Sequence, residues 1–246
     1  MSELHRPSHP VRFVTASSLF DGHDASINIM RRILQSQGAE VIHLGHNRSV
    51  AEVVDAAIEE DVQGIAVSSY QGGHVEYFKY LVELLQQRGA GHIKVYGGGG
   101  GVIVADEIAG LASVGVTIFS PEAGQNLGLP MMLNTLIREC DVDVMSFGQP
   151  DLAGLQAGDH GAIARAITAA ELGQLDESVA TSVAAIAAGS SARVLGITGT
   201  GGSGKSSLTD ELIRRFRLDQ EDKLSIAVVA IAAAAPRIAP GGWFYV

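Results

Sequence analysis

Five short apolar runs alternate with five amphipathic stretches over residues 10–140 of this 246-residue chain. We expect the apolar runs to form strands over residues 11–16, 40–45, 64–69, 93–96 and 116–120. Helical spacing of apolar side chains predicts helices over residues 27–37, 50–60, 74–88, 105–112 and 125–139. Parallel strands need crossover connections, which helices supply. The alternation therefore predicts an α/β fold, a doubly wound sheet of five parallel strands.

The strand–helix pattern changes after residue 140. Turn residues surround two helical stretches, at 160–171 and 174–188, which we interpret as a helical linker. A second α/β unit then begins, with expected strands and a helix over residues 194–198, 205–217 and 225–231. Residues 232–246 show no period that we can interpret. The predicted domains are residues 10–140, 141–191 and 192–246.

Composition excludes several classes of protein. A content of 46% hydrophobic and 18% charged residues is typical of globular chains, and the net charge of −10 is the wrong sign for binding nucleic acid. The single cysteine, Cys140, excludes an internal disulfide and fits a reducing compartment. The N-terminus has no signal-peptide core, and no apolar run has the roughly 18 residues of a membrane span. We expect a soluble, cytoplasmic protein with no nucleic-acid or membrane partner.

The first expected strand is followed by a loop that contains a histidine, in the sequence Asp21-Gly22-His23-Asp24-Ala25-Ser26. Ligands of open parallel sheets bind beyond the carboxyl ends of the strands, so His23 is placed to serve one. A metal-bound imidazole usually donates its other N–H to a carboxylate, and Asp21 is close enough in sequence to accept it. The alternative is that His23 is an ordinary loop histidine and Asp21 a helix cap.

Two further loops follow the third and fourth expected strands. Forty-one residues separate Ser26 from Ser68-Ser69-Tyr70, and 26 residues separate Tyr70 from the run Gly97 to Gly101. Glycine allows a ligand to approach the backbone closely. The glycine run is therefore a candidate binding surface beside the histidine loop.

Asp-x-His, Ser-x-Tyr and the glycine run, at these intervals, resemble the cobalamin-binding domains of methylmalonyl-CoA mutase, glutamate mutase and methionine synthase over residues 10–140. The resemblance implies a flavodoxin-like, Rossmann-like domain in which the nucleotide tail of cobalamin lies in a slot between the sheet and a helix. It implies that His23 binds the cobalt from below and Asp21 supports it, with Ser68 and Tyr70 near the tail. The remaining residues implied to bind the cofactor are Gly22, Asp24, Ser26, Gly97, Gly98, Gly99, Gly100, Gly101 and Ser120.

Two positions depart from that family's pattern. Ser26 stands where the family has glycine, and Tyr70 stands where it has leucine. Ser26 is small and able to cap the next helix, so we expect binding to survive. Tyr70 is expected to narrow the slot for the tail.

The second unit contains Gly199-Thr200-Gly201-Gly202-Ser203-Gly204-Lys205-Ser206, which fits the phosphate-binding pattern G-x-x-x-x-G-K-[ST]. Loop N–H groups and the following helix N-terminus attract phosphate, Lys205 neutralises its charge, and Ser206 binds Mg²⁺. The predicted nucleotide-binding residues are Gly199, Gly201, Gly202, Ser203, Gly204, Lys205, Ser206 and Ser207. The alternative is a glycine-rich turn, and no asparagine for a guanine-reading Asn-Lys-x-Asp motif follows Lys205.

This loop and its flanks resemble the GTPase chaperones of cobalamin mutases, and the whole layout resembles the fused isobutyryl-CoA mutases. The resemblance implies the N-terminal portion of a radical enzyme that interconverts isobutyryl-CoA and n-butyryl-CoA with adenosylcobalamin, GTP or GDP, and Mg²⁺. It places the acyl-CoA substrate in a barrel domain missing here, with no catalytic residue in this chain and a homodimer at full length. Two alternatives stay open: a non-catalytic cobalamin carrier or sensor with a nucleotide switch, and a flavin domain, which needs no axial imidazole.

Four further residues are weighed as ordinary structural ones. His43 and His46 flank a strand end and are expected to be loop or rim residues, because no third metal ligand lies nearby in sequence. His74 begins a helix near the expected slot, with contact to the cofactor left open. Cys140 is expected to be a small buried residue rather than a nucleophile.

Overall fold

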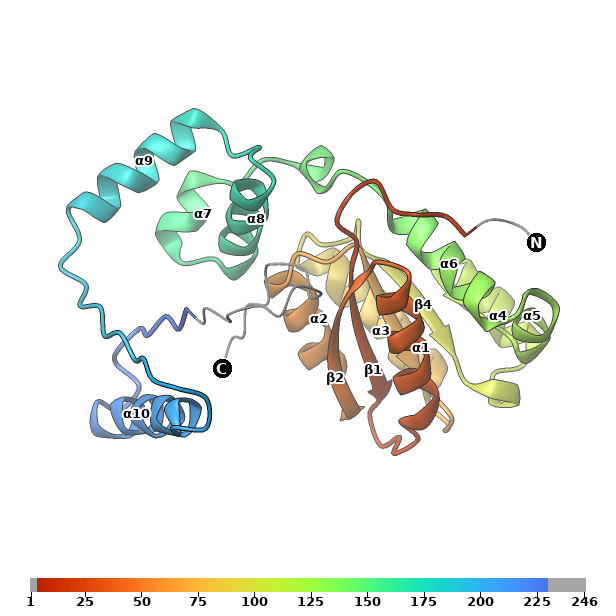
Figure 1. The fold of residues 1–246 in the computed structure, drawn as a ribbon. Coiled ribbons are helices and arrows are strands. Elements are labelled where there is room, and N and C mark those ends of the chain that lie inside the picture. Colours follow the sequence, from red (N-terminus) through yellow and green to blue (C-terminus); the bar gives the residue numbers. More distant parts are fainter. Residues whose placement is uncertain (1–3, 230–246) are drawn as a thin grey trace. The chain divides into compact units, whose positions relative to one another are not determined.

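A computed structural model describes residues 4–229, and the chain divides into two compact units after Gly189. The first unit contains a five-stranded sheet of order β2-β1-β3-β4-β5 in which all neighbouring strands are parallel (Figure 1). The strands are β1 (Arg12–Ser18), β2 (Glu40–Arg48), β3 (Gly64–Ser68), β4 (Lys94–Gly98) and β5 (Val116–Ile118). The predicted doubly wound sheet is confirmed.

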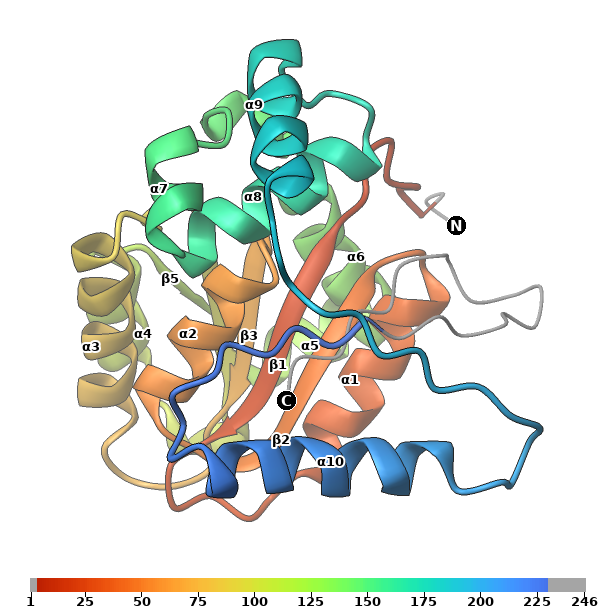
Figure 2. The ribbon, with the colours of Figure 1, turned by 90° about the vertical axis from the view of Figure 1, so that its left-hand side faces the viewer.

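Helices cover both faces of this sheet, and Figure 2 shows α1 and α3 on opposite sides of the strands. One face carries α1 (Ala25–Ser36), α5 (Pro121–Leu127) and α6 (Leu129–Cys140). The other face carries α2 (Val50–Glu59), α3 (His74–Gln87) and α4 (Ala105–Ala112), while the short 3₁₀ helix η1 (Gly100–Val102) follows β4. Burial on both faces explains the continuous apolar strands.

The alternation of side chains along each strand divides the core into two layers. Val14 and Ile65 pack with the helices α2 and α3, whereas Phe13 and Tyr96 pack with α1 and α6. Successive residues of a strand point to opposite faces, so β1 contributes to both layers. Cys140 is buried beside Tyr96, as expected of a structural cysteine.

Local signals explain where two of the helices begin and end. Ser49 caps α2 through a capping box with Glu52, in which the Ser49 hydroxyl accepts from the Glu52 N–H and the Glu52 carboxylate accepts from the Ser49 N–H. The single helix expected over residues 125–139 is wrong. The chain forms α5 and α6 instead, because Gly128 adopts φ 75°, which interrupts the helix between them.

Residues 141–189 belong to the same compact unit as the sheet. They form η2 (Val144–Phe147), α7 (Leu152–Ala157), α8 (His160–Glu171) and α9 (Glu177–Ala188), of which α7 is not anticipated by the sequence pattern. Arg165 of α8 pairs with Asp61 at 2.7 Å, and Arg12 of β1 donates to Thr168 at 3.0 Å. α8 is thereby attached to the sheet and to the turn that follows α2. The domain boundaries proposed from sequence stay predictions.

The second unit contains the helix α10 (Lys205–Asp219). The strand expected over residues 194–198 is wrong, and so is the described part, 225–229, of the strand expected over 225–231. A parallel strand needs a hydrogen-bonded neighbour, and the described residues of this unit form no sheet. Val194 is 96% exposed as a result. Residues 230–231 and the sequence 232–246 lie outside the described residues.

A membrane-spanning helix is missing from residues 4–229, where no helix combines the necessary length and hydropathy.

Candidate functional site

The three loops predicted from sequence lie together at the carboxyl ends of the strands β1, β3 and β4. β1 and β3 are adjacent, with Ser17 opposite Ser68, and Ser68 lies opposite Gly98 of β4. The strand β2 is added on one side of β1, and β3 is added on the other side, so the strand order reverses between β1 and β3. Ligands of doubly wound folds bind at this reversal, beyond the carboxyl ends of the strands.

His23 and Asp21 form a hydrogen-bonded pair in the loop after β1. Nδ1 of His23 lies 2.9 Å from Oδ1 of Asp21, and the His23 backbone N–H donates to the same oxygen at 2.8 Å. The imidazole is 75% exposed, whereas the carboxylate is fully buried. Because Asp21 occupies Nδ1, the exposed ring presents Nε2 to a ligand. The alternative that Asp21 caps α1 is wrong, since Asp24 occupies that position.

Asp21 also reaches the loop after β3. Its Oδ2 accepts a hydrogen bond from the Tyr70 backbone N–H at 2.6 Å. Burial alone would raise the pKa of Asp21, but the donors from His23 and Tyr70 outweigh burial and hold that pKa below its usual value. The carboxylate therefore stays charged at neutral pH and fixes the ring of His23.

Four buried serines join β1 to β3 behind this pair. Ser17 lies 2.9 Å from Ser68 through their hydroxyl oxygens, and the Ser18 hydroxyl donates to Ser69 at 2.8 Å. The Ser17 hydroxyl also donates to the His23 carbonyl at 3.2 Å. Ser17 and Ser18 are absent from the sequence prediction, although a serine pair ending the first apolar run, like the pair ending the third, is a usable signal.

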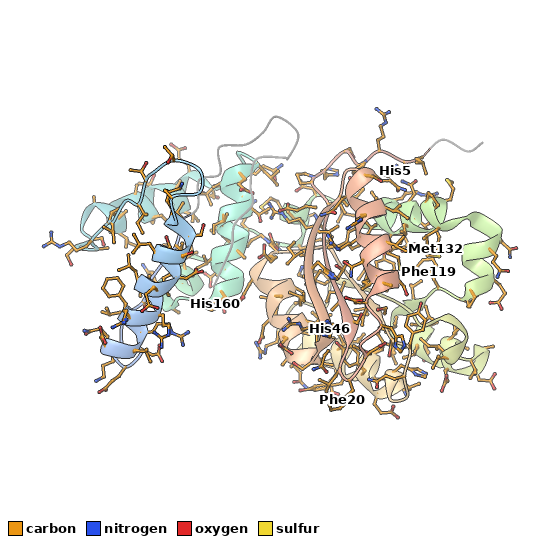
Figure 3. All side chains as sticks on the ribbon, turned by 60° about the horizontal axis from the view of Figure 1, so that its bottom comes forward. His5, Phe20, His46, Phe119, Met132 and His160 are labelled. Atoms are coloured by element: carbon orange, nitrogen blue, oxygen red, sulfur yellow. The ribbon has the colours of Figure 1, made fainter. Side chains whose placement is uncertain are left out.

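An apolar pocket of about 260 Å³ lies beside these loops, between the sheet and the helices α1, α5 and α6. Seven of the predicted residues line it: Ser68, Tyr70, Gly97, Gly98, Gly99, Gly100 and Ser120, the last of which follows β5. Apolar side chains missed by the sequence prediction complete the wall, among them Ile27, Met30, Leu34, Phe119, Met132 and Leu133. Phe119 and Met132, both labelled in Figure 3, belong to this wall. The pocket suits a largely apolar group.

The glycines of the run 97–101 differ in why the structure needs glycine at each position. A Cβ at Gly99 would overlap the carbonyl oxygen of Ser69, and a Cβ at Gly97 would overlap the Phe78 ring and the Ile118 side chain. Gly100 adopts φ 58°, which favours glycine. Gly101 has open space around it and does not belong to the pocket wall. Close packing of the protein itself, rather than room for a ligand alone, therefore accounts for Gly97 and Gly99.

Other predicted residues lie at the rim or outside the pocket. Gly22 has open space around it, Asp24 precedes α1 without a side-chain cap, and Ser26 lies in the first turn of α1. His74 contacts Glu107 through Nε2 and the Gln71 carbonyl through Nδ1, each at 3.0 Å, and is not among the residues that line the pocket. His43 lies on β2, and its Nδ1 is 2.9 Å from the hydroxyl oxygen of Thr15 on β1.

The donor set determines what kind of metal centre His23 can serve. One imidazole supplies one bond, so a metal held by Nε2 must bring its other ligands with it, as a macrocycle does. Residues 4–229 hold no group of three or more His, Cys, Asp or Glu side chains able to bind a metal ion. A metal macrocycle with an attached apolar group fits the single imidazole and its neighbouring apolar pocket.

The predicted phosphate loop precedes α10 in the second unit. Gly202 and Gly204 have φ of 74° and 81°, and the Lys205 ammonium donates to the carbonyl oxygens of Gly199 at 2.8 Å and Thr200 at 2.7 Å. Lys205 thus folds back over the loop. Gly201, Ser203, Ser206 and Ser207 are exposed at the loop and the first turn of α10.

Two protein-family models match parts of this chain. Residues 11–123 match the B12 binding domain, and residues 163–242 match the methylmalonyl-CoA mutase-associated GTPase MeaB. The 2-hydroxyisobutanoyl-CoA mutase small subunit of Aquincola tertiaricarbonis is 36% identical over 107 residues, which are 44% of this chain and 77% of that subunit. The chain belongs to the B12-binding acyl-CoA mutase family.

Within this family, fused isobutyryl-CoA mutases match nearly the whole chain. The protein from Nocardia farcinica is 63% identical over 230 residues, and that from Geobacillus kaustophilus is 59% identical over 239 residues, each covering 94% of this chain. The chain spans about a fifth of their length, 21% and 22%. The resemblance to the cobalamin-binding and GTPase-chaperone portion of a fused mutase is confirmed, and with it cobalamin and GTP or GDP as cofactors.

Proposed function

We propose that this chain provides the cofactor site and the start of the GTPase domain of a radical acyl-CoA mutase, with isobutyryl-CoA and n-butyryl-CoA as its substrates. The observation that carries the proposal is the exposed His23 imidazole, held by the buried Asp21 carboxylate 2.9 Å away at the reversal point of the sheet. The names of the similar fused proteins support the choice of substrates.

The residues at this edge fit adenosylcobalamin. His23 would bind the cobalt through Nε2, while Asp21 keeps Nδ1 protonated and orients the ring. The apolar pocket would hold the flat base of the nucleotide tail, with Ser68 and Tyr70 in its wall. When bound, the cofactor supplies a carbon radical by cleavage of its cobalt–carbon bond, and the protein contributes position and shielding.

The second unit would bind GTP or GDP at the loop that ends at Lys205. The N–H groups of the loop and the N-terminus of α10 attract phosphate, and Lys205 would exchange its two carbonyl contacts for phosphate oxygens. Ser206, exposed in the first turn of α10, would bind Mg²⁺. GTP hydrolysis would then serve the loading of cobalamin in the full-length protein.

The full-length protein would supply the substrate-binding part of the enzyme. The acyl-CoA substrate would bind in a barrel domain outside these 246 residues, and the full-length mutase would be a cytoplasmic homodimer. The small-subunit relative supports a cobalamin domain that acts together with a separate substrate-binding part.

Titration of the chain with aquacobalamin, followed by its absorption spectrum, tests the cofactor site. We expect a spectrum with histidine bound to cobalt, and His23→Ala should remove that spectrum and weaken binding at least tenfold, or about 1.4 kcal/mol. His160→Ala is the matched control, because His160 is also an exposed histidine paired with a carboxylate, Glu59, but lies on α8. An unchanged spectrum and affinity in His23→Ala would show that the assignment of the axial ligand is wrong.

A further inference from the structure

A hydrogen bond joins two elements that face each other across the end of the apolar pocket. The Ser26 hydroxyl, in the first turn of α1, lies 2.9 Å from the Tyr70 hydroxyl, which extends from the loop after β3. Tyr70 lines the pocket, and so does Ile27, the residue that follows Ser26. The hydrogen bond therefore connects the helical wall of the pocket to its sheet wall.

The Tyr70 ring lies at the end of the pocket nearest to the histidine. Its centroid is 5.7 Å from the centroid of the His23 ring, and a Cβ at Gly100 would be 3.1 Å from its Cε1. The ring thus fills the space between the histidine loop and the glycine loop. A group that extends from His23 into the pocket has to pass this ring.

The backbone of Tyr70 is held in place while its side chain depends on one polar contact. Its N–H donates to the buried Asp21 carboxylate at 2.6 Å, which anchors the loop. Within residues 4–229, the hydroxyl of this side chain makes one hydrogen bond, to the hydroxyl of Ser26. Rotation of the side chain alone, after this hydrogen bond breaks, would open the pocket.

We propose that Ser26 and Tyr70 form a latch across the mouth of the pocket, and that this latch controls the entry of corrinoids that carry a nucleotide tail. The inference rests on the proposed cobalamin site. A corrinoid without a tail needs His23 but not the pocket, so the latch acts on one class of corrinoid and not on the other. The pair is in this sense a specificity-determining pair.

Removing either hydroxyl should open the latch. A neutral hydrogen bond of typical net strength corresponds to about a fivefold change in an equilibrium. We therefore expect Tyr70→Phe and Ser26→Ala each to raise the association rate of aquacobalamin about fivefold. The double variant should show no further increase, because each substitution removes the same interaction.

Stopped-flow absorbance with aquacobalamin and with diaquacobinamide, which has no nucleotide tail, tests the latch. The cobinamide rate should be the same in all these variants. Tyr77→Phe is the matched control, because it also removes a tyrosine hydrogen bond, the one to the Arg48 carbonyl at 3.0 Å, at a distance from the pocket wall.

The outcomes separate the latch from the cofactor site. Unchanged cobalamin rates, additive effects in the double variant, or an equal acceleration of cobinamide would each overturn the latch while corrinoid binding itself persists. A chain that binds neither corrinoid would overturn the cofactor site and the latch together. Circular dichroism of each variant confirms that its fold is retained.

Discussion

Asp21 places one carboxylate oxygen 2.9 Å from Nδ1 of His23, and its other oxygen accepts the backbone N–H of Tyr70. A single buried side chain thus orients the imidazole and connects the loop after β1 to the loop after β3. Both oxygens of this carboxylate accept hydrogen bonds from N–H groups. An amide in its place would turn an NH₂ group, which cannot accept, toward one of these donors.

Asp21→Asn should therefore weaken the binding of aquacobalamin about 10- to 100-fold. Whichever way the amide turns, its NH₂ group faces an N–H of His23 or of Tyr70, so one of these hydrogen bonds is lost. Absorbance titration measures the affinity. Asp55→Asn, an exposed carboxylate on α2 paired with Arg88, is the control, and an affinity of Asp21→Asn equal to that of the control would contradict the supporting role.

Gly99→Ala should destabilise the sheet domain by about 1–3 kcal/mol. The added methyl group would overlap the Ser69 carbonyl oxygen, which is backbone and cannot move independently. Gly101→Ala offers a comparison two residues away, since nothing lies within 4 Å of its Cβ position. Urea unfolding followed by circular dichroism measures both, and equal stabilities would refute the packing reason for Gly99.

Arg165→Ala should lower the free energy of unfolding by about 3 kcal/mol. Its side chain is 13% exposed and its partner Asp61 is 7% exposed, so the substitution leaves a carboxylate buried without its cation. Arg165 also donates to the carbonyl oxygen of Val144 at 2.9 Å. Thermal and urea unfolding measure the loss, with the exposed Arg138→Ala as control, and a loss no larger than the control's would show that α8 is held by other contacts.

Asp141→Asn should make stability less dependent on acid pH. The Asp141 side chain is buried, which raises its pKa, but N–H groups of Ser8 and His9 and the imidazoles of His5 and His9 outweigh burial and hold that pKa well below its usual value. A carboxyl with a lowered folded pKa stabilises the fold above its unfolded pKa of about 3.9, and this contribution is lost as the pH falls further.

The wild-type chain should exceed Asp141→Asn in unfolding free energy by about 2 kcal/mol at pH 6, and the difference should shrink below about pH 4. Urea unfolding at a series of pH values measures it. A difference that stays constant from pH 6 to pH 3 would mean that Asp141 does not hold the N-terminal segment as a carboxylate.

Two residues that the sequence marks as departures from the family pattern prove to be partners. Ser26 and Tyr70 are 44 positions apart, and their contact follows from β1 lying beside β3. No local pattern reports that contact. The same holds for the serine pairs that join these strands and for the overlap that requires glycine at position 99.

In the second unit, the sequence pattern predicts a strand that the structure does not form. Val194 and its neighbours have the composition of a buried strand, and they form none here, because a strand exists only with a hydrogen-bonded neighbour. The phosphate loop before Lys205 forms nonetheless, since glycines at φ above 70° and a helix N-terminus are local features.

The amino-acid sequence by itself determined the five strand–helix units, the two-sided core and the three loops that carry His23, Ser68 and the glycines. These follow from side-chain periodicity and turn chemistry, which act over a few neighbouring residues. Only the tertiary structure decided that Asp21 serves two loops, that Tyr70 meets Ser26, and that α8 attaches to the sheet. Those contacts join residues far apart in the chain, so they depend on the order of the strands and not on any local pattern.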